Sequence, residues 1–154
     1  MSKARGHRNR SFFRQHSLSI VVVGILILWI FLYTRANPST HLGSFFGNAV
    51  ADWTGLVVTV IATKYFYEVG SAESRKPRGA GVGGHLRHIL RNHSLTLFLL
   101  VTGIAWVALY AHMNSEAKWG QVVGNIVSEW TQLLGMVLLT KRLIEEKSKE
   151  SKAR

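Results

Sequence analysis

Long apolar runs alternate with short charged segments along this chain. Residues 17–34 and 94–111 contain no Asp, Glu, Lys or Arg, and each run is about as long as a helix must be to cross a bilayer. Two further stretches, residues 36–63 and 119–140, are free of these charges except for a single carboxylate each. The pattern predicts an all-α membrane protein with four transmembrane helices, at about residues 18–34, 43–66, 94–111 and 120–143.

The two halves of the chain repeat one another. The segment Gly47-Asn48-Ala49-Val50-Ala51-Asp52-Trp53-Thr54 returns 77 residues later as Gly124-Asn125-Ile126-Val127-Ser128-Glu129-Trp130-Thr131. With that offset the chain aligns with itself end to end without a gap, and about a third of the aligned residues are identical. We therefore expect two tandem two-helix units, residues 1–77 and 78–154. Because each unit crosses the membrane twice, the units are predicted to be parallel and related by a pseudo-twofold axis along the membrane normal.

Basic residues gather on one side of the predicted spans. All but two of the 19 Lys and Arg residues lie before the first span, between the second and third, or after the fourth; the exceptions are Arg35 and Lys118. The positive-inside rule therefore predicts cytoplasmic termini and a cytoplasmic central linker, in a multi-pass protein of the plasma or inner membrane. Each basic cluster adjoins a span, so the net charge of +11 indicates anionic lipid headgroups as partners on the cytoplasmic side, and not nucleic acid.

Polar residues follow one face of the second span and recur in the fourth. In the second span they are spaced by three or four residues, which keeps them on one side of a helix: Asn48, Asp52, Gly55, Thr59 and Thr63. The fourth span has Asn125, Glu129, Gln132, Met136 and Thr140 in the equivalent positions. Polar groups in a membrane helix must meet protein or water, so we expect these two faces to point at each other or into a common interior. The candidate intramembrane polar cluster is Asn48, Asp52, Asn125 and Glu129.

Three interpretations of this cluster are open. If the two units bring the carboxylates together, the pair could share a proton or hold a cation. If Asn48 and Asn125 hydrogen-bond the acids, the cluster is a polar clamp that fixes helix packing. In the third interpretation a basic residue of the outer loops folds back as the partner of an acid, the candidates being Arg35, His41, His112 and Lys118.

Small and aromatic residues suggest packing positions. Residues every fourth position in the second and fourth spans are small, which permits close helix contact, and we assign the helix-packing role to Gly43, Gly47, Gly120 and Gly124. Four aromatic residues toward the outer ends of the first and third spans are predicted to be interfacial anchors: Trp29, Tyr33, Trp106 and Tyr110.

The segments outside the spans are short. Residues 1–15 are expected to be a basic tail or interfacial turn, and residues 85–91 an amphipathic segment on the inner membrane surface. Residues 141–154 carry Lys and Glu at helical spacing and are expected to extend the last helix. Ser17 and Ser94 are predicted N-caps of the first and third spans.

The sequence offers no set of catalytic or cofactor-binding residues. Cysteine is absent, no nucleophile sits beside a base, and there is no metalloprotease or phosphate-loop motif. His85, His88 and His93 lie near one another, but no carboxylate or thiolate beside them completes a metal site, so an interfacial role is preferred. We therefore expect no enzymatic activity, no metal and no cofactor. The first functional prediction is a structural, accessory or interaction protein that acts as a homo-oligomer or in a membrane complex; the alternative is a proton or cation channel or transporter using Asp52 and Glu129.

Several short motifs resemble a family of uncharacterised small bacterial membrane proteins built from a tandem two-helix unit. The second unit shows three of these motifs: Asn92-His93-Ser94-Leu95-Thr96-Leu97, Asn125-Ile126-Val127-Ser128-Glu129-Trp130-Thr131-Gln132 and Lys147-Ser148-Lys149-Glu150-Ser151-Lys152. Gly70-Ser71-Ala72-Glu73-Ser74-Arg75 is similar to the ending of the family's unit. The resemblance implies a four-helix fold and a location in the bacterial inner membrane, and it implies no activity.

Overall fold

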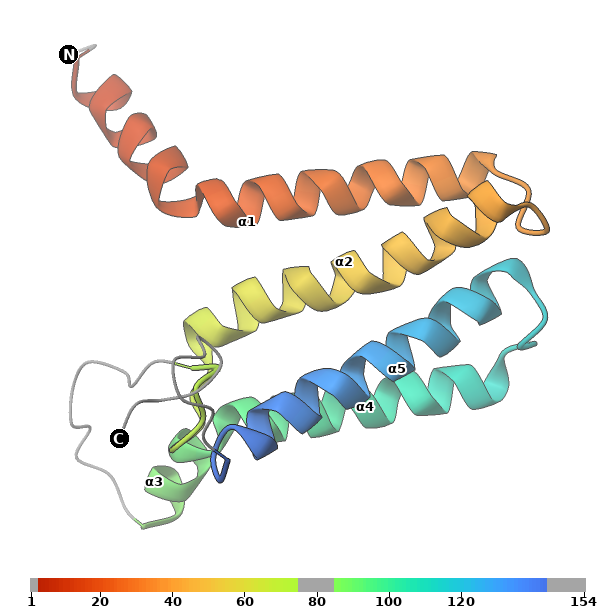
Figure 1. The fold of residues 1–154 in the computed structure, drawn as a ribbon. Coiled ribbons are helices and arrows are strands. Elements are labelled where there is room, and N and C mark those ends of the chain that lie inside the picture. Colours follow the sequence, from red (N-terminus) through yellow and green to blue (C-terminus); the bar gives the residue numbers. More distant parts are fainter. Residues whose placement is uncertain (1–2, 75–84, 144–154) are drawn as a thin grey trace.

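The described part of the chain is helical. The computed structural model describes residues 3–74 and 85–143, and within these ranges it has five helices and one isolated β-bridge (Figure 1). The helices are α1 (Lys3–Arg35), α2 (His41–Tyr65), α3 (His85–Asn92), α4 (Ser94–His112) and α5 (Lys118–Leu139). All of them except α3 contain a segment that is long and apolar enough to cross a membrane. The prediction of an all-α protein with four candidate membrane-spanning helices is therefore confirmed.

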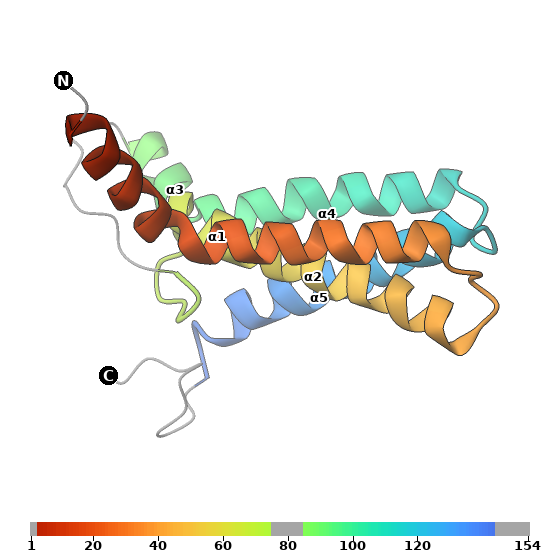
Figure 2. The same cartoon turned by 90° about the horizontal axis from the view of Figure 1, so that it is seen from above.

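The four long helices form two hairpins that pack side by side. α1 packs against α2, α4 packs against α5, and α2 and α5 contact each other between the hairpins (Figures 1 and 2). We call the end with the loops of residues 36–40 and 113–117 the hairpin end, and the end with residues 66–74 and 85–93 the linker end. The packing of α2 against α5 is therefore the main helix–helix contact between the two halves of the chain.

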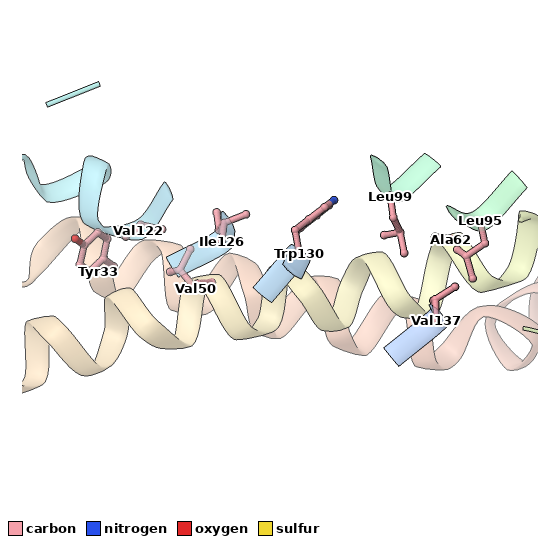
Figure 3. Packing of buried hydrophobic residues seen from close by; sticks show 10 residues of the cluster. Tyr33, Val50, Ala62, Leu95, Leu99, Val122, Ile126, Trp130 and Val137 are labelled. Carbon is pink, nitrogen blue, oxygen red and sulfur yellow. The ribbon is translucent and has the colours of Figure 1, made fainter. Parts of the chain in front are cut away.

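The buried apolar residues form a row along the bundle rather than a compact ball. Figure 3 shows this row running from Tyr33 and Val122 at one end, past Trp130, to Leu95 and Val137 at the other. Lipid tails are as apolar as these side chains, so in a membrane the row stabilises the bundle mainly by close packing rather than by exclusion of water. The indole of Trp130 adds a polar contact, since its Nε1 donates to Thr102 Oγ1 at 2.8 Å.

The ends of three helices differ from the sequence-based expectation. α1 begins at Lys3, so residues 3–15 are helical and not an irregular tail, and the N-terminal part bends away from the bundle in Figure 1. Ser17 therefore lies inside a helix and is not an N-cap. α4 does begin at Ser94, but its N-cap residue is His93, whose side chain makes no capping hydrogen bond. Ser94 Oγ instead accepts from the backbone N–H of Tyr67 and donates to the carbonyls of Tyr67 and Arg91.

The fourth membrane-spanning helix, α5, is shorter than expected. It ends at Leu139, and residues 140–142 form a turn, so the expected continuation through residue 143 is wrong. The turn after the helix places the Lys141 ammonium 2.6 Å from the buried carboxylate of Glu68. Residues 144–154, expected to continue it, lie outside the described residues. The amphipathic segment at residues 85–91 is a helix, α3.

Glycines in both hairpins allow the helices to approach their own loops. A side chain at Gly43 would overlap the carbonyl of Asn37, and one at Gly120 would overlap the carbonyl of Asn114. Gly47 lies against the ring of Tyr33, where a Cβ atom would be 3.0 Å from Cε2. The structure thus places these glycines in contacts within each hairpin, between a helix and the element that precedes it.

Tyr33 is a core residue and not an interfacial anchor. It is 1% exposed, and its hydroxyl donates to the backbone carbonyl of Lys118 at the start of α5. This hydrogen bond joins α1 to α5 at the hairpin end. The sequence could not distinguish this role from anchoring, because both place an aromatic ring near the end of a span.

Candidate functional site

Asn48 and Asn125 meet at the interface of α2 and α5. Asn125 Nδ2 donates to Asn48 Oδ1 at 2.6 Å, and both residues occupy the same position in the two halves of the sequence. The predicted meeting of the two polar faces is therefore seen at this pair. The amides bond to each other, and not to the acids as the polar-clamp interpretation requires.

Asp52 and Glu129 lie near each other at this interface, one turn further along. The Asp52 carboxyl is close enough to act on the Glu129 carboxyl by charge. Gly55 makes room for this arrangement, because a Cβ atom there would lie 3.3 Å from Glu129 Oε2. Two ionised carboxyl groups this close repel each other, and a shared proton or a cation relieves that repulsion. The pair is therefore chemically able to hold a proton or, when both groups are ionised, a cation.

One side of the polar interface is open. Asn48 and Asp52 are exposed on α2, and Gln132, which donates to Glu129 Oε1 at 3.4 Å, is exposed on α5. Asp52 lies 11 residues after His41, the first residue of α2, which is about 17 Å along the helix axis. These side chains are thus exposed at a depth where a membrane-spanning helix normally shows only apolar groups to lipid.

A polar cavity at the hairpin end leads toward this pair. It has a volume of about 490 Å³ and is lined by Ser44, Asn48, Gln121 and Asn125, with the two tyrosines Tyr33 and Tyr110 at its walls. The Asn48–Asn125 bond forms part of its lining, and the carboxylates lie one turn beyond. The cavity therefore brings polar groups from the end of the bundle to within a helical turn of the acids.

Lys118 was one of the basic residues considered as a partner for the acids, and it is engaged elsewhere. Its ammonium donates to the carbonyl of Ala36 at 2.6 Å and to that of Thr34 at 3.2 Å, and it lies 4.9 Å from the centre of the Tyr33 ring. These contacts satisfy carbonyl groups at the end of α1. They keep the cation at the hairpin end, away from Asp52 and Glu129.

A second polar cluster lies at the linker end, around a carboxylate that the sequence did not single out. Glu68 is fully buried, and its Oε1 accepts hydrogen bonds from Lys141 Nζ and His93 Nδ1, each at 2.6 Å. Its Oε2 accepts from the backbone N–H of Thr96 at 3.3 Å. Glu68, which follows α2, is therefore bonded both to residues at the beginning of α4 and to a residue just after the end of α5.

The local backbone places Glu68 in this position. The chain leaves α2 at Phe66 and pairs briefly with residues before α4, with Val69 N donating to Asn92 O at 2.8 Å. Gly70 has a φ of 85°, a conformation that side chains disfavour, and it turns the chain back. Ser74 Oγ then accepts from the Glu68 backbone N–H at 2.9 Å.

Among the described residues, no group of three or more His, Cys, Asp and Glu side chains lies close enough to hold a metal ion. Comparison with protein-family models, curated proteins and solved structures finds no match. The function is therefore inferred from the two polar clusters. The resemblance to small bacterial membrane proteins stays a prediction.

The Glu68 cluster was missed because its members are ordinary in the sequence. Glu68 lies among polar linker residues, and Lys141 counts only as one more basic residue after a span. The available signal was the internal repeat: Glu68, His93 and Lys141 all have identical residues at the 77-residue offset, in Glu145, His16 and Lys64. Glu145 lies outside the described residues, but Lys64 Nζ and His16 Nδ1 are 2.9 Å apart.

Acid should weaken the link that Glu68 makes. Burial alone raises the pKa of Glu68, but the hydrogen bonds from Lys141, Thr96 and His93 outweigh it, so the pKa lies below its usual value. The folded protein therefore releases this proton more readily than the unfolded chain. The stabilisation is fully present above the pKa of the unfolded chain and is lost as the pH falls through the lowered pKa of the folded state.

We expect this pH-dependent stabilisation to be present in wild type and absent in Glu68→Gln. Thermal unfolding in detergent between about pH 3 and pH 7 would show a larger acid-induced drop in the midpoint for wild type, because Glu is titrated near pH 4 in unfolded chains. Glu116→Gln, which neutralises an exposed carboxylate in a hairpin loop, is the control and should follow wild type. If the unfolding midpoints of all three proteins fell equally as the pH is lowered, Glu68 would not be the group that stabilises the folded protein.

Proposed function

We propose that the protein binds protons or small cations within the membrane, at the Asp52–Glu129 pair. The observation that carries this proposal is that the Glu129 carboxyl lies against α2 beside Gly55, close to Asp52, inside the predicted spans. Carboxylates are costly at this depth, and a clamp that only held helices together would gain nothing from placing two acids together. A pair that exchanges a proton or a cation accounts for both the depth and the like charges.

Polar groups on either side of the pair support a path to it. On the hairpin side, the cavity of about 490 Å³ reaches the Asn48–Asn125 bond. On the linker side, Thr59 and Thr63 continue the polar face of α2 and line a second cavity of about 600 Å³, together with Glu73. The acids thus lie between two cavities that open toward opposite ends of the bundle.

We further propose that the hairpin end faces outward and that both termini are cytoplasmic, in a plasma or inner membrane. The distribution of Lys and Arg supports this orientation. The two units would be parallel and related by a pseudo-twofold axis along the membrane normal. The equivalent contacts of Gly47 with Tyr33 and of Gly124 with Tyr110, each at 3.0 Å for an added Cβ atom, support the same construction in both units.

Flux measurements test the proposed activity. In liposomes containing the purified protein, we expect wild type to carry protons or monovalent cations down an imposed gradient. Asp52→Asn with Glu129→Gln should reduce the flux by at least about tenfold, because the amides keep the size of the side chains but cannot take up a proton or balance a cation. A pH-sensitive dye and a potassium or sodium electrode would read the two ions separately.

Glu116→Gln serves as the control for the loss of a carboxylate outside the spans, and the unfolding midpoint of each variant checks that it is folded. The activity is rejected if wild type shows no flux above empty liposomes. It is rejected equally if the double variant, folded and inserted, conducts as well as wild type does.

A second candidate is the interaction or accessory role that the sequence favoured. The observation in its favour is the exposure of polar side chains on one side of α2 and α5, including Asn48, Asp52 and Gln132. Such a surface within a membrane is suited to another protein rather than to lipid. The geometry ranks this role second, because contact alone does not explain the paired acids. The two roles are compatible. The interaction role depends on which molecule contacts this surface.

A further inference from the structure

An exposed polar surface runs along α2 and α5 on the side where the two acids are found. Its members come from both helices and are all exposed: Ser44, Asn48, Asp52, Gln121, Ser128 and Gln132. On α5 the exposed positions are separated by seven and four residues, so they follow one side of the helix. We call these six residues the polar surface.

Lipid cannot cover this surface at low cost. A carboxylate, three amides and two hydroxyl groups on one side of two membrane-spanning helices would lose their hydrogen bonds to water and gain none from acyl chains. In the described part of the chain, α1 packs on α2 and α4 packs on α5, and these two contacts leave the polar surface open. Another molecule is therefore needed to cover it.

We propose that this molecule is a second copy of the chain, inserted in the same orientation, and that the two polar surfaces form a symmetric dimer with its twofold axis along the membrane normal. Such a contact is isologous, so a surface can pair with itself only if it supplies both hydrogen-bond donors and acceptors. The polar surface does so. The Asp52 carboxylate is an acceptor, and the amides of Gln121 and Gln132 and the hydroxyl of Ser128 are donors.

The depths of these groups also match. A twofold axis along the membrane normal keeps every residue at its own depth, so only groups at the same level can pair. Asp52 lies 11 residues from the start of α2 and Ser128 lies 10 residues from the start of α5, which puts both about 15–17 Å from the hairpin end. Ser128 of the second copy is thus level with Asp52, and Gln132 lies about one turn deeper, within reach of a long side chain.

A different membrane protein fits this surface less well. It would have to present donors to Asp52 and acceptors to the amides at matching levels, a pattern that the chain itself already provides. A copy of the chain also enters the same membrane in the same orientation. The dimer adds hydrogen-bond donors from a second chain near the proposed ion-binding pair. It is inferred from the exposed polar surface and does not depend on whether the protein conducts ions.

Cysteine crosslinking tests the dimer, because the chain contains no cysteine of its own. Ser128→Cys places a thiol in the polar surface. Val101→Cys is the matched control: it is 67% exposed, and it lies 11 residues from the end of α4, at the same depth on an apolar helix. In native membranes at low expression, a short bis-maleimide should crosslink Ser128→Cys into a homodimer at least about tenfold more than Val101→Cys.

Three results would overturn the dimer. They are equal crosslinking of the two variants, capture of a different protein by Ser128→Cys in mass spectrometry, and single-step photobleaching of the labelled wild type in nanodiscs. Gln132→Cys replaces Ser128→Cys if that variant does not fold. The outcomes separate from the proposed function: flux from a demonstrated monomer rejects the dimer alone, and a crosslinked dimer without flux rejects the ion-binding activity alone.

Discussion

Lys141→Met is expected to lower the stability of the folded protein by about 3–5 kcal/mol, the cost of leaving a buried charge without its partner. The carboxylate that would be left is Glu68, which is fully buried and 2.6 Å from the Lys141 ammonium. Its remaining donors, His93 and the backbone of Thr96, cannot supply the permanent positive charge that burial demands. The free energy of unfolding, measured by denaturant titration in mixed micelles, is the quantity to compare.

Arg142→Met is the matched control, because it removes a neighbouring exposed cation from the same turn and should change stability by less than about 0.5 kcal/mol. The double variant Glu68→Leu with Lys141→Met should be more stable than Lys141→Met alone, since no buried charge is left unpaired. If Lys141→Met and Arg142→Met are equally mild, the ion pair does not hold the two halves of the chain together.

Gly43→Ala, like its counterpart Gly120→Ala, is expected to be among the most damaging glycine substitutions in the described chain, with a cost of about 3 kcal/mol or more. The added Cβ atom would lie 1.9 Å from the Asn37 carbonyl oxygen. That oxygen belongs to the backbone and also accepts the Thr40 N–H at 3.1 Å, so it cannot move without opening the turn between α1 and α2. Unfolding in mixed micelles would report this loss directly.

Gly135→Ala provides the comparison, because nothing lies within 4 Å of its added Cβ atom and alanine favours a helix. This variant should be neutral or slightly more stable than wild type. Gly47→Ala should fall between the two, since its new atom meets a ring, which can shift, and not a backbone carbonyl. Equal stability of Gly43→Ala and Gly135→Ala would show that the α1–α2 turn is not constrained as described.

The helices were predictable because their signals are strong and local. Apolar length locates each membrane-spanning helix, and the spacing of polar residues on α2 correctly places Asn48 and Asn125 at a shared interface. Helix ends were less predictable. Nothing within residues 3–15 prevents a helix, so they continue α1. α5 ends before the predicted residue, and the turn that follows it contacts a residue 73 positions earlier in the chain.

The Glu68 cluster could not be derived from local pattern. It depends on a turn at Gly70, on the pairing of two short extended segments, and on the exact level at which α5 ends. Each is a tertiary feature. The sequence also left open whether Asp52 and Glu129 come close together. The repeat predicts equal depth for the two acids, but only helix packing brings the Glu129 carboxyl against α2 near Asp52.

The Glu68 contact also constrains the order in which the protein can be built. A ribosome delivers Glu68 to the membrane surface well before Lys141, which follows 73 residues later. During that interval Glu68 lacks the ammonium group that it contacts in the folded protein, so burial of its carboxylate is costly until Lys141 has been made. The last residue of the cluster to be synthesised therefore completes the link between the two halves of the chain, and a nascent protein that is truncated before Lys141 lacks this link.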